Sequence, residues 1–341
     1  MRRIAFLVVL AVVAASAGVN SSPAQSVTRS DALLEALPDG TAVAVINLQK
    51  IAGSSLWTTI NGQNKIKGEI DKVQSEMANL GVTLSEVHTV ALVFPGGSLN
   101  NPTVALSGGF ERNDLLARLR AGGKVKLTSE KYKDIEIYKA KSLTAAVRST
   151  EQSGAKSVRP PMAAVTKNEI TFVFYDASTL VAGSLDAVRA SIDVKTGAKP
   201  GLTQNSRLAD ALAQNPAAAI RFAFALTPTM TDGLRAGDLP VDFSSISFVF
   251  GTIDVGSGID FNATLRSDNA EHAKSIAEKL NALLTMASGF LGSMSDPKMT
   301  PIAEALKTVT ISSADADVKI LGNLPMGLLE SLLSSSTKKG Q

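Results

Sequence analysis

Apolar and polar residues along this chain form short runs that recur in a fixed order. Residues 87–123 read as a strand, a turn of Gly, Asn and Pro, a second strand and a helix, and residues 245–284 read the same way. A further pair of strands follows each helix, at 124–140 and at 308–322. The pattern therefore predicts two units with the same succession of elements.

The stretches that open the two units also match. Residues 31–48 and 206–226 each contain a capping residue, a short helix, a turn and an apolar strand, with Asp31 and Ser206 at the caps. Three matched blocks in one order favour an internal duplication. The identity between the copies is low, and hairpins and helices also recur by chance in α+β proteins, so the alternative stays open.

The apolar stripes of the predicted helices indicate how the layers pack. Residues 270–291 carry one stripe at helical spacing, made of Ala273, Ile276, Ala277, Leu280, Leu283, Leu284, Ala287 and Leu291. A second helix is predicted over 67–80. Hairpin-linked strands beside such helices predict an α+β fold of two tandem units, each an antiparallel sheet with helices packed on one face.

The N-terminus has the pattern of an export signal. Two arginines precede an apolar run from Ile4 to about Val13, and small residues follow. This order predicts a signal peptide over residues 1–24, cleaved near residue 17 or 24. The run is shorter than the ~20 residues that span a bilayer, which disfavours the alternative of an uncleaved anchor. We therefore expect an exported protein, periplasmic or extracellular, that meets the membrane only through this segment before cleavage.

The length of 341 residues exceeds one average domain and predicts two. We place the first unit at 27–200 and the second at 201–335, followed by a polar tail at 336–341. A polar stretch with a glycine and a Pro-Pro pair predicts a mobile loop within the first unit, at about 145–162.

Charge and cysteine content exclude several classes of function. The chain has 34 basic and 31 acidic residues, and removal of Arg2 and Arg3 with the signal brings it close to neutral. Such a chain lacks the concentrated basic charge that nucleic-acid binding requires, so we expect no nucleic-acid partner. The absence of cysteine rules out disulfides and thiolate metal sites.

The step from Gly183 to Ser184 after a predicted strand raises the question of a nucleophilic serine. A nucleophile elbow reads Gly-x-Ser-x-Gly, but Ser184 follows glycine directly and Leu185 and Asp186 come next. Ser184 stands where a helix N-cap belongs, and Asp186 would lie in the first turn, where a carboxylate favours the helix dipole. The pattern predicts a helix cap.

The two histidines have no partners at the spacing of a catalytic or zinc site. His88 lies at the start of a predicted strand, and His272 follows Glu271 on the polar side of a helix. Neither belongs to an HExxH motif or has a second histidine four residues away. We expect His88 at a strand edge and His272 in solvent.

Asp315 and Asp317 form the clearest carboxylate pair. Alternate residues of a strand share a face at a spacing of about 7 Å. Such a pair would suit a glycosidase or a cation site, but the solvent face of a strand also explains it, and we favour the latter. Residues 254–260 lack the alternating ligands of a calcium loop and predict a hairpin turn. We assign no catalytic, cofactor-binding or metal-binding residue.

Six lysines lie within residues 124–141, against three acidic residues. They would suit an acidic surface polymer or lipid head groups. Lysine on an edge strand also prevents edge-to-edge pairing, and we favour that role.

Two segments of the chain resemble recurring pieces of uncharacterised exported bacterial envelope proteins. The first is Leu37–Pro38 with the strand Ala42–Leu48, and the second is the strand Leu180–Ser184 with the helix Leu185–Ile192. The resemblance implies an envelope or periplasmic protein built from duplicated α+β units, and it brings no catalytic residues with it.

Three hypotheses for function follow. The favoured one is an exported, non-catalytic protein that binds an envelope protein, another macromolecule or an apolar ligand. The second is an exported hydrolase that uses Ser184 or the carboxylate pair, which requires a histidine or a further acid beside those groups in one cleft. The third is a structural spacer of the envelope.

Overall fold

The computed structural model describes residues 32–61, 71, 74, 81–96, 101–123, 125–142, 169–227, 241–294 and 299–337. The predicted signal peptide, most of the helix at 67–80, the loop at 145–162 and the last four residues lie outside the described residues. The chain forms two compact units. The first unit consists of two segments, one up to Gly53 and one from Asn64 to Asp210. The second unit consists of the segment from Ser54 to Gln63 and of the chain from Ala211 onward.

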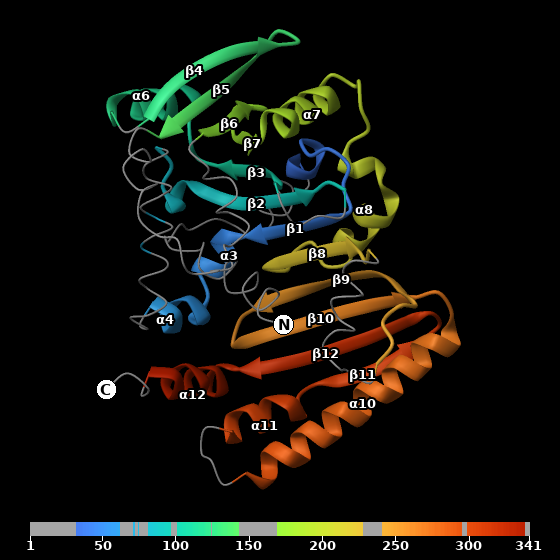
Figure 1. The fold of residues 1–341 in the computed structure, drawn as a ribbon. Helices are drawn as coiled ribbons and strands as arrows, with labels where there is room; N and C mark the ends of the chain where they lie inside the picture. The colour runs from blue at the N-terminus through green and yellow to red at the C-terminus, as the bar shows by residue number, and fades with distance from the viewer. Residues whose placement is uncertain are drawn as a thin grey trace, which may run out of the picture. The chain divides into compact units, whose positions relative to one another are not determined.

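The described strands of the first unit form an antiparallel sheet in the order β1-β2-β3-β7-β6-β5-β4 (Figure 1). They are β1 (Ala42–Asn47), β2 (Val87–Phe94), β3 (Thr103–Gly108), β4 (Val125–Tyr132), β5 (Ile135–Ser142), β6 (Glu169–Phe174) and β7 (Thr179–Gly183). The helices are α3 (Leu48–Ala52), α6 (Arg112–Ala121) and α7 (Leu185–Lys195), and α8 (Ser206–Ala213) follows where the chain leaves the unit.

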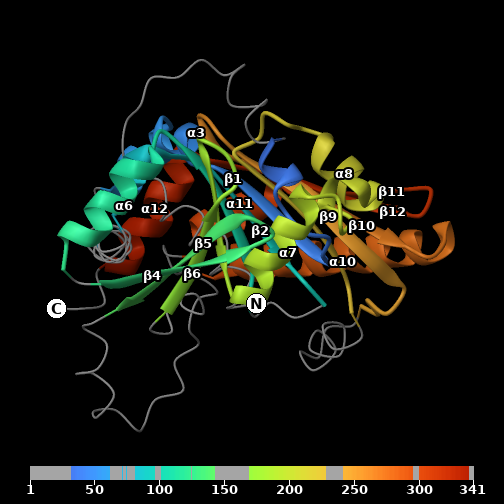
Figure 2. The ribbon, with the colours of Figure 1, turned by 90° about the horizontal axis from the view of Figure 1, so that it is seen from above.

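Helices α6 and α7 cover opposite faces of this sheet (Figure 2). Arg112 of α6 donates a hydrogen bond to the Tyr138 hydroxyl of β5, whereas Arg189 of α7 donates to Glu130 of β4. Glu130 pairs across the strands with Ile137, and successive residues of a strand point to opposite faces. The first unit therefore has a helix on each side of its sheet, because the β6–β7 hairpin leads into the additional helix α7.

The second unit has an antiparallel sheet in the order β11-β12-β10-β9-β8. Its strands are β8 (Ile220–Ala225), β9 (Ile246–Val255), β10 (Gly258–Ser267), β11 (Thr310–Ala314) and β12 (Asp317–Pro325). Its helices are α4 (Ser55–Asn61), α10 (Ala270–Ser293), α11 (Thr300–Lys307) and α12 (Met326–Thr337). The mixture of antiparallel sheets and helices confirms the predicted α+β class.

Strands and helices follow one another in the same order in both units. The succession β2, β3, α6, β4, β5 corresponds to β9, β10, α10, β11, β12, with α11 added after α10. The sheet orders also correspond, except that β6 and β7 separate β3 from β5. This agreement is the pattern that a duplication would leave, and the duplication itself stays a prediction.

The long helix α10 is held through its N-terminal half. Ala273, Ile276 and Ala277 are buried against Val249 and Val318 of the sheet. Burying a side chain the size of isoleucine contributes roughly 1.5–3 kcal/mol, so these contacts fix the helix to the sheet. Leu280 and Leu283 are packed against the same cluster but are only partly buried. Contact with the core therefore decreases along the helix.

The lysine-rich strand β4 forms one edge of the first unit's sheet. This is the position at which lysines would prevent pairing with a further strand. Lys139 of β5 pairs with Glu130, and Lys133 in the turn pairs with Asp193 of α7. Lys126 and Lys131 are exposed. The position at the edge supports the favoured role of these lysines.

A buried carboxylate joins α7 to the β4–β5 hairpin. Asp193 is 6% exposed, and its side chain accepts hydrogen bonds from Lys133 Nζ at 2.7 Å and from the Tyr132 hydroxyl at 3.0 Å, with Lys199 Nζ at 3.2 Å. Chiefly through the hydrogen bond from Lys133, the pKa of Asp193 is lowered to about 2. The ionised carboxylate therefore stabilises this part of the fold.

Replacement of this carboxylate, Asp193→Asn, should lower the free energy of unfolding of the first unit by about 2 kcal/mol at neutral pH. Because the folded-state pKa lies below the unfolded-state pKa, the stabilisation is complete above a pH of about 4 and is lost as the pH falls to about 2. Urea titrations at both ends of this range would measure it through the tyrosine signals, since Tyr132, Tyr138 and Tyr175 all belong to the first unit.

The matched control is Glu278→Gln, which removes an exposed carboxylate from α10 in the other unit. It should leave the tyrosine transition unchanged at both pH values. A gap between wild type and Asp193→Asn that stays the same at low pH would contradict the role given to the ionised carboxylate.

Candidate functional site

Ser184 is the N-cap of α7, as the sequence predicts. Its Oγ accepts a hydrogen bond from the Ala187 backbone N–H at 3.2 Å, and Asp186 lies in the first turn. The hydroxyl is thus engaged by its own helix, and a cap of this kind contributes about 1 kcal/mol. The nucleophile hypothesis receives no support at this position.

The histidines lie in different units. His88 is half-buried in β2, and His272 lies in the first turn of α10, where its side chain is 53% exposed. The Nδ1 atom of His272 is 2.7 Å from Asp268 Oδ1, and this hydrogen bond lowers the pKa of Asp268. His272 is therefore a solvated residue at a helix terminus, as expected.

Asp315 and Asp317 do not share a strand face, and the expectation that they alternate along one strand is wrong. Asp315 stands in the turn between β11 and β12 with φ of +51°, and Asp317 is the first residue of β12. Both oxygens of Asp317 accept hydrogen bonds from Arg266, at 2.8 and 2.9 Å. This bidentate pair raises the pKa of Arg266 and commits the carboxylate to joining β10 and β12.

Residues 254–260 contain the hairpin turn between β9 and β10, as predicted, and Val255 at the end of β9 pairs with Ile259 of β10. Across the described chain, no group of three or more histidine, aspartate or glutamate side chains is placed to hold a metal ion.

The C-terminal half of α10 presents an apolar stripe to solvent. Met286, Phe290 and Met294 are 65%, 63% and 40% exposed, and their spacing of four residues aligns them along one face of the helix and its end. No residue from 280 to 294 carries a charge. A row of large exposed apolar side chains often marks a surface that binds another molecule. We call these three residues the α10 stripe.

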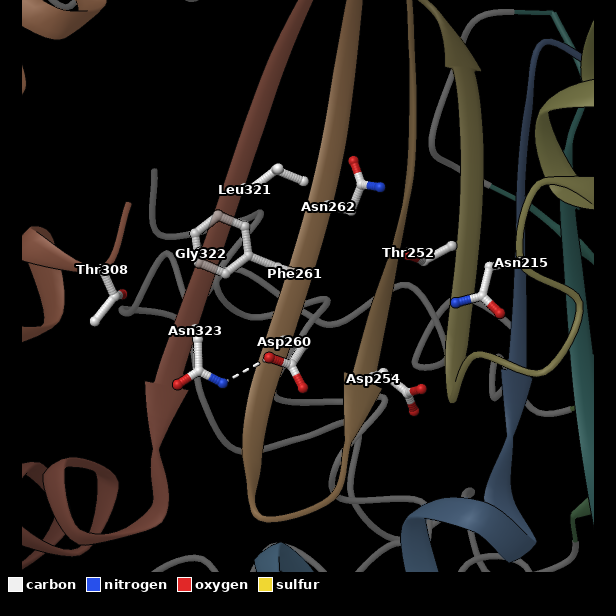
Figure 3. A pocket seen from close by; sticks show the side chains of 10 residues that line it. All are labelled: Asn215, Thr252, Asp254, Asp260, Phe261, Asn262, Thr308, Leu321, Gly322 and Asn323. Atoms are coloured by element: carbon white, nitrogen blue, oxygen red, sulfur yellow. Dashed lines mark hydrogen bonds between the residues drawn. The ribbon is translucent and has the colours of Figure 1, made fainter. Parts of the chain in front are cut away.

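A shallow hollow of about 450 Å³ lies over β9, β10 and β12 (Figure 3). The residues that shape it include Asn215, Asp254, Asp260, Asn262, Leu321 and Asn323. Strand alternation places these side chains of the three strands on the sheet face opposite Val249, Leu265 and Val318, which pack against α10. Phe261 and Gly322, which also line the hollow, belong by the same alternation to the face that packs against α10.

Sequence reasoning did not identify either surface. The C-terminal half of α10 is uncharged on every side, so its sequence does not indicate which side faces solvent. The hollow depends on pairing between strands that are far apart in the chain. Within the described residues, none of the helices combines the length and the apolar character needed to cross a bilayer.

These observations define a two-unit α+β protein with an apolar helical surface and a shallow hollow of mixed lining on a sheet. No protein-family model matches the chain, and no curated protein matches it. Among solved structures, crystal form III of TP0453 aligns at a TM-score of 0.47 and 11% identity, over 89% of this chain and 97% of that one. Crystal form I of TP0453 aligns at 0.42 and 10%, over 89% and 96%. The function is therefore inferred from this chain's own residues.

Proposed function

We propose that this chain is an exported, non-catalytic protein that binds a macromolecular partner of the cell envelope through the α10 stripe. The observation that carries the proposal is the exposure of Met286, Phe290 and Met294 on a helix half without charge. Burying apolar surface is the main favourable contribution to most protein associations, and aligned apolar side chains at helical spacing are a common form of such a contact.

The shape of the stripe favours a macromolecule over a small apolar ligand. A small apolar ligand binds in a concave pocket that removes most of its surface from water. The stripe projects outward from a helix, and the hollow of the same unit is open and lined by carboxylates and amides as well as by Phe261 and Leu321. A partner that supplies its own apolar groove would complement the three side chains.

The residues considered for a hydrolase have other partners. Ser184 caps α7, and Asp317 is bound by Arg266. Export is supported by the N-terminal sequence, in which a cationic start precedes a short apolar run and small residues. Together these features favour binding outside the cytoplasm over catalysis.

Photocrosslinking in intact cells tests the proposal. A photoreactive amino acid at position 290 should give a discrete adduct with another envelope macromolecule, identified by mass spectrometry. The same group at position 285 is the matched control, because Thr285 is exposed on α10 but lies about a quarter turn from the stripe. Adducts that are equal at both positions, or that join two copies of this chain or contain only lipid, would contradict a macromolecular partner at the stripe.

A further inference from the structure

The turn between β4 and β5 determines which backbone groups of β4 point away from the sheet. Lys133 and Asp134 form this two-residue turn with φ of +49° and +62°, and two positive φ values are typical of a type I′ hairpin. In such a hairpin the flanking residues, Tyr132 and Ile135, exchange backbone hydrogen bonds. Because bonded and non-bonded pairs alternate along an antiparallel ladder, the even-numbered residues of β4 bond to β5 and the odd-numbered residues point outward.

The outer side of β4 therefore presents an open row of N–H and C=O groups, from Val125, Leu127, Ser129 and Lys131. Among the described strands, none pairs with this side, and β4 ends the strand order of the first unit (Figure 1). The strand has eight residues, about 26 Å of extended backbone, whereas edges that avoid pairing are often very short. This edge can accommodate one further strand.

The charge along the edge is positive. Lys126 and Lys131 are exposed, and Lys141 of β5, directly opposite Lys126, is exposed as well. The ion pairs within the described part of the chain involve none of these three lysines. The nearest acidic residues in the strand register are Asp134 in the turn and Glu169, which lies beside Lys141 on β6.

The two carboxylates within the hairpin are already engaged. Glu130 accepts a hydrogen bond from Lys139 Nζ at 2.5 Å, and this bond lowers the pKa of Glu130. Glu136, opposite Lys131, accepts a hydrogen bond from the Tyr138 hydroxyl at 2.6 Å, which lowers its pKa as well. Both carboxylates therefore stabilise the hairpin from within, and the lysines at the edge remain available for a partner.

These lysines discriminate between possible strands. Two copies of β4 placed edge to edge would bring lysines against lysines, so the edge disfavours pairing with itself. A strand with carboxylates beside Lys126 and Lys131 would instead gain favourable cross-strand pairs. Repulsion of like-charged strands and attraction of acidic ones are two parts of the same specificity.

The positions of the lysines define the strand that fits. Lys126 and Lys131 lie near the two ends of β4, and strand alternation places them on opposite faces of the sheet. Between them, Leu127 is half-buried and Thr128 is uncharged. A complementary segment has acidic residues at both ends and apolar or β-branched residues, which favour strands, in the middle.

From the open ladder and its charge we propose that the β4 edge binds an extended acidic segment of another protein by strand addition. Backbone hydrogen bonds to the odd-numbered residues of β4 supply the affinity, and the lysines select the charge of the segment. The site is independent of the proposed function, because it belongs to the first unit and uses none of the residues of the α10 stripe.

Fluorescence anisotropy with a dye-labelled peptide, acetyl-Glu-Glu-Thr-Val-Thr-Val-Glu-Glu-amide, tests the proposal on the full chain. One comparison peptide has lysine in place of every glutamate, and another carries a methyl group on every backbone nitrogen, which keeps the charge and removes the N–H donors. At low ionic strength the acidic peptide should bind at least about tenfold more tightly than either. Its affinity should fall as salt is added.

Charge reversal at the edge, Lys126→Glu with Lys131→Glu, should weaken binding of the acidic peptide by about tenfold. The matched control is Lys274→Glu with Lys279→Glu, which changes the net charge equally at two exposed positions of α10 in the other unit. It should change the affinity less than about twofold. Since all four lysines are exposed, matching thermal unfolding of the variants verifies that the fold is intact.

Amide exchange measured by NMR distinguishes strand addition from charge attraction alone. The peptide should slow exchange at Leu127, Ser129 and Lys131, whose N–H groups point outward, and leave Thr128 and Glu130 nearly unchanged.

Four results would overturn the proposal. They are no binding of the acidic peptide at millimolar concentration, equal binding of the methylated peptide, and equal losses in the two double variants. The fourth is binding to phosphatidylglycerol vesicles that charge reversal at the edge abolishes, with no affinity for the peptide, which would assign the lysines to a lipid surface.

Discussion

Replacing Met286 and Phe290 together by glutamate should weaken binding of the envelope partner at least about a hundredfold. Each side chain loses roughly 1.5–3 kcal/mol of apolar burial, and a factor of a hundred corresponds to about 2.7 kcal/mol. Both positions are more than 60% exposed in the structure, so the substitutions should leave the fold intact. The measurement is a binding titration of the partner identified by crosslinking against the purified chain.

The matched control for this double variant is Thr285→Glu. It adds a charge to the same exposed half of α10, about a quarter turn from the stripe, where the Thr285 hydroxyl donates to Asn281 O of its own helix. Its affinity for the partner should stay within about threefold of wild type. An equal loss in the control and in the double variant would show that charge on the helix, and not the stripe, governs binding.

The largest effect on stability is expected from Gly251→Ala in β9. A Cβ at this position would stand 2.1 Å from the Asn262 carbonyl oxygen and 2.9 Å from Ala263 Cα, both backbone atoms of β10. These backbone atoms cannot move away from the added Cβ unless β9 and β10 separate. We expect a loss of about 3 kcal/mol in the unfolding free energy of the second unit. The single tryptophan, Trp57, belongs to that unit and reports its unfolding by fluorescence.

Gly289→Ala provides the opposite result with the same chemical change. Gly289 lies in the interior of α10, is exposed, and has no atom within 4 Å of an added Cβ. Alanine is favoured over glycine in a helix by roughly 0.5–1 kcal/mol, so this variant should be slightly more stable than wild type. Similar midpoints for the two variants in urea would contradict the close strand contact described at Gly251.

Local patterns predicted much of the fold. The alternation in β9 and β10, the turn between them, the cap at Ser184 and the helix from 270 onward are all present. These features depend on neighbours within a few residues, which a sequence displays directly. The corresponding order of elements in the two units was also visible for this reason.

Features that depend on distant contacts were not predicted. The segment beginning at Ser54 joins the second unit, where the Ser55 hydroxyl donates to Gly256 O at 2.8 Å, two hundred residues along the chain. Asp315 was assigned to a strand because its neighbours alternate, but the strand reverses there through a residue with positive φ. Aspartate tolerates that conformation better than most residues, so the composition of the turn gave only a weak signal.

The α10 stripe shows a different limit of periodicity. Leu283, Leu284, Ala287 and Leu291 mark one apolar face, while Met286 and Phe290 mark another beside it. Where a helix is apolar on most of its circumference, the pattern cannot say which face the core occupies. Only the position of the sheet, fixed by Ala273, Ile276 and Ala277 in the first half of the helix, leaves Met286 and Phe290 in water.

Hydrogen exchange of the chain alone and in complex with its crosslinked partner tests the central claim most directly. The account predicts that the partner slows amide exchange in the C-terminal half of α10, from about residue 282 to 294, and leaves the β4–β5 hairpin of the first unit unchanged. Protection that appears in the hairpin or elsewhere, with α10 exchanging as fast as in the free chain, would contradict the α10 stripe as the binding surface.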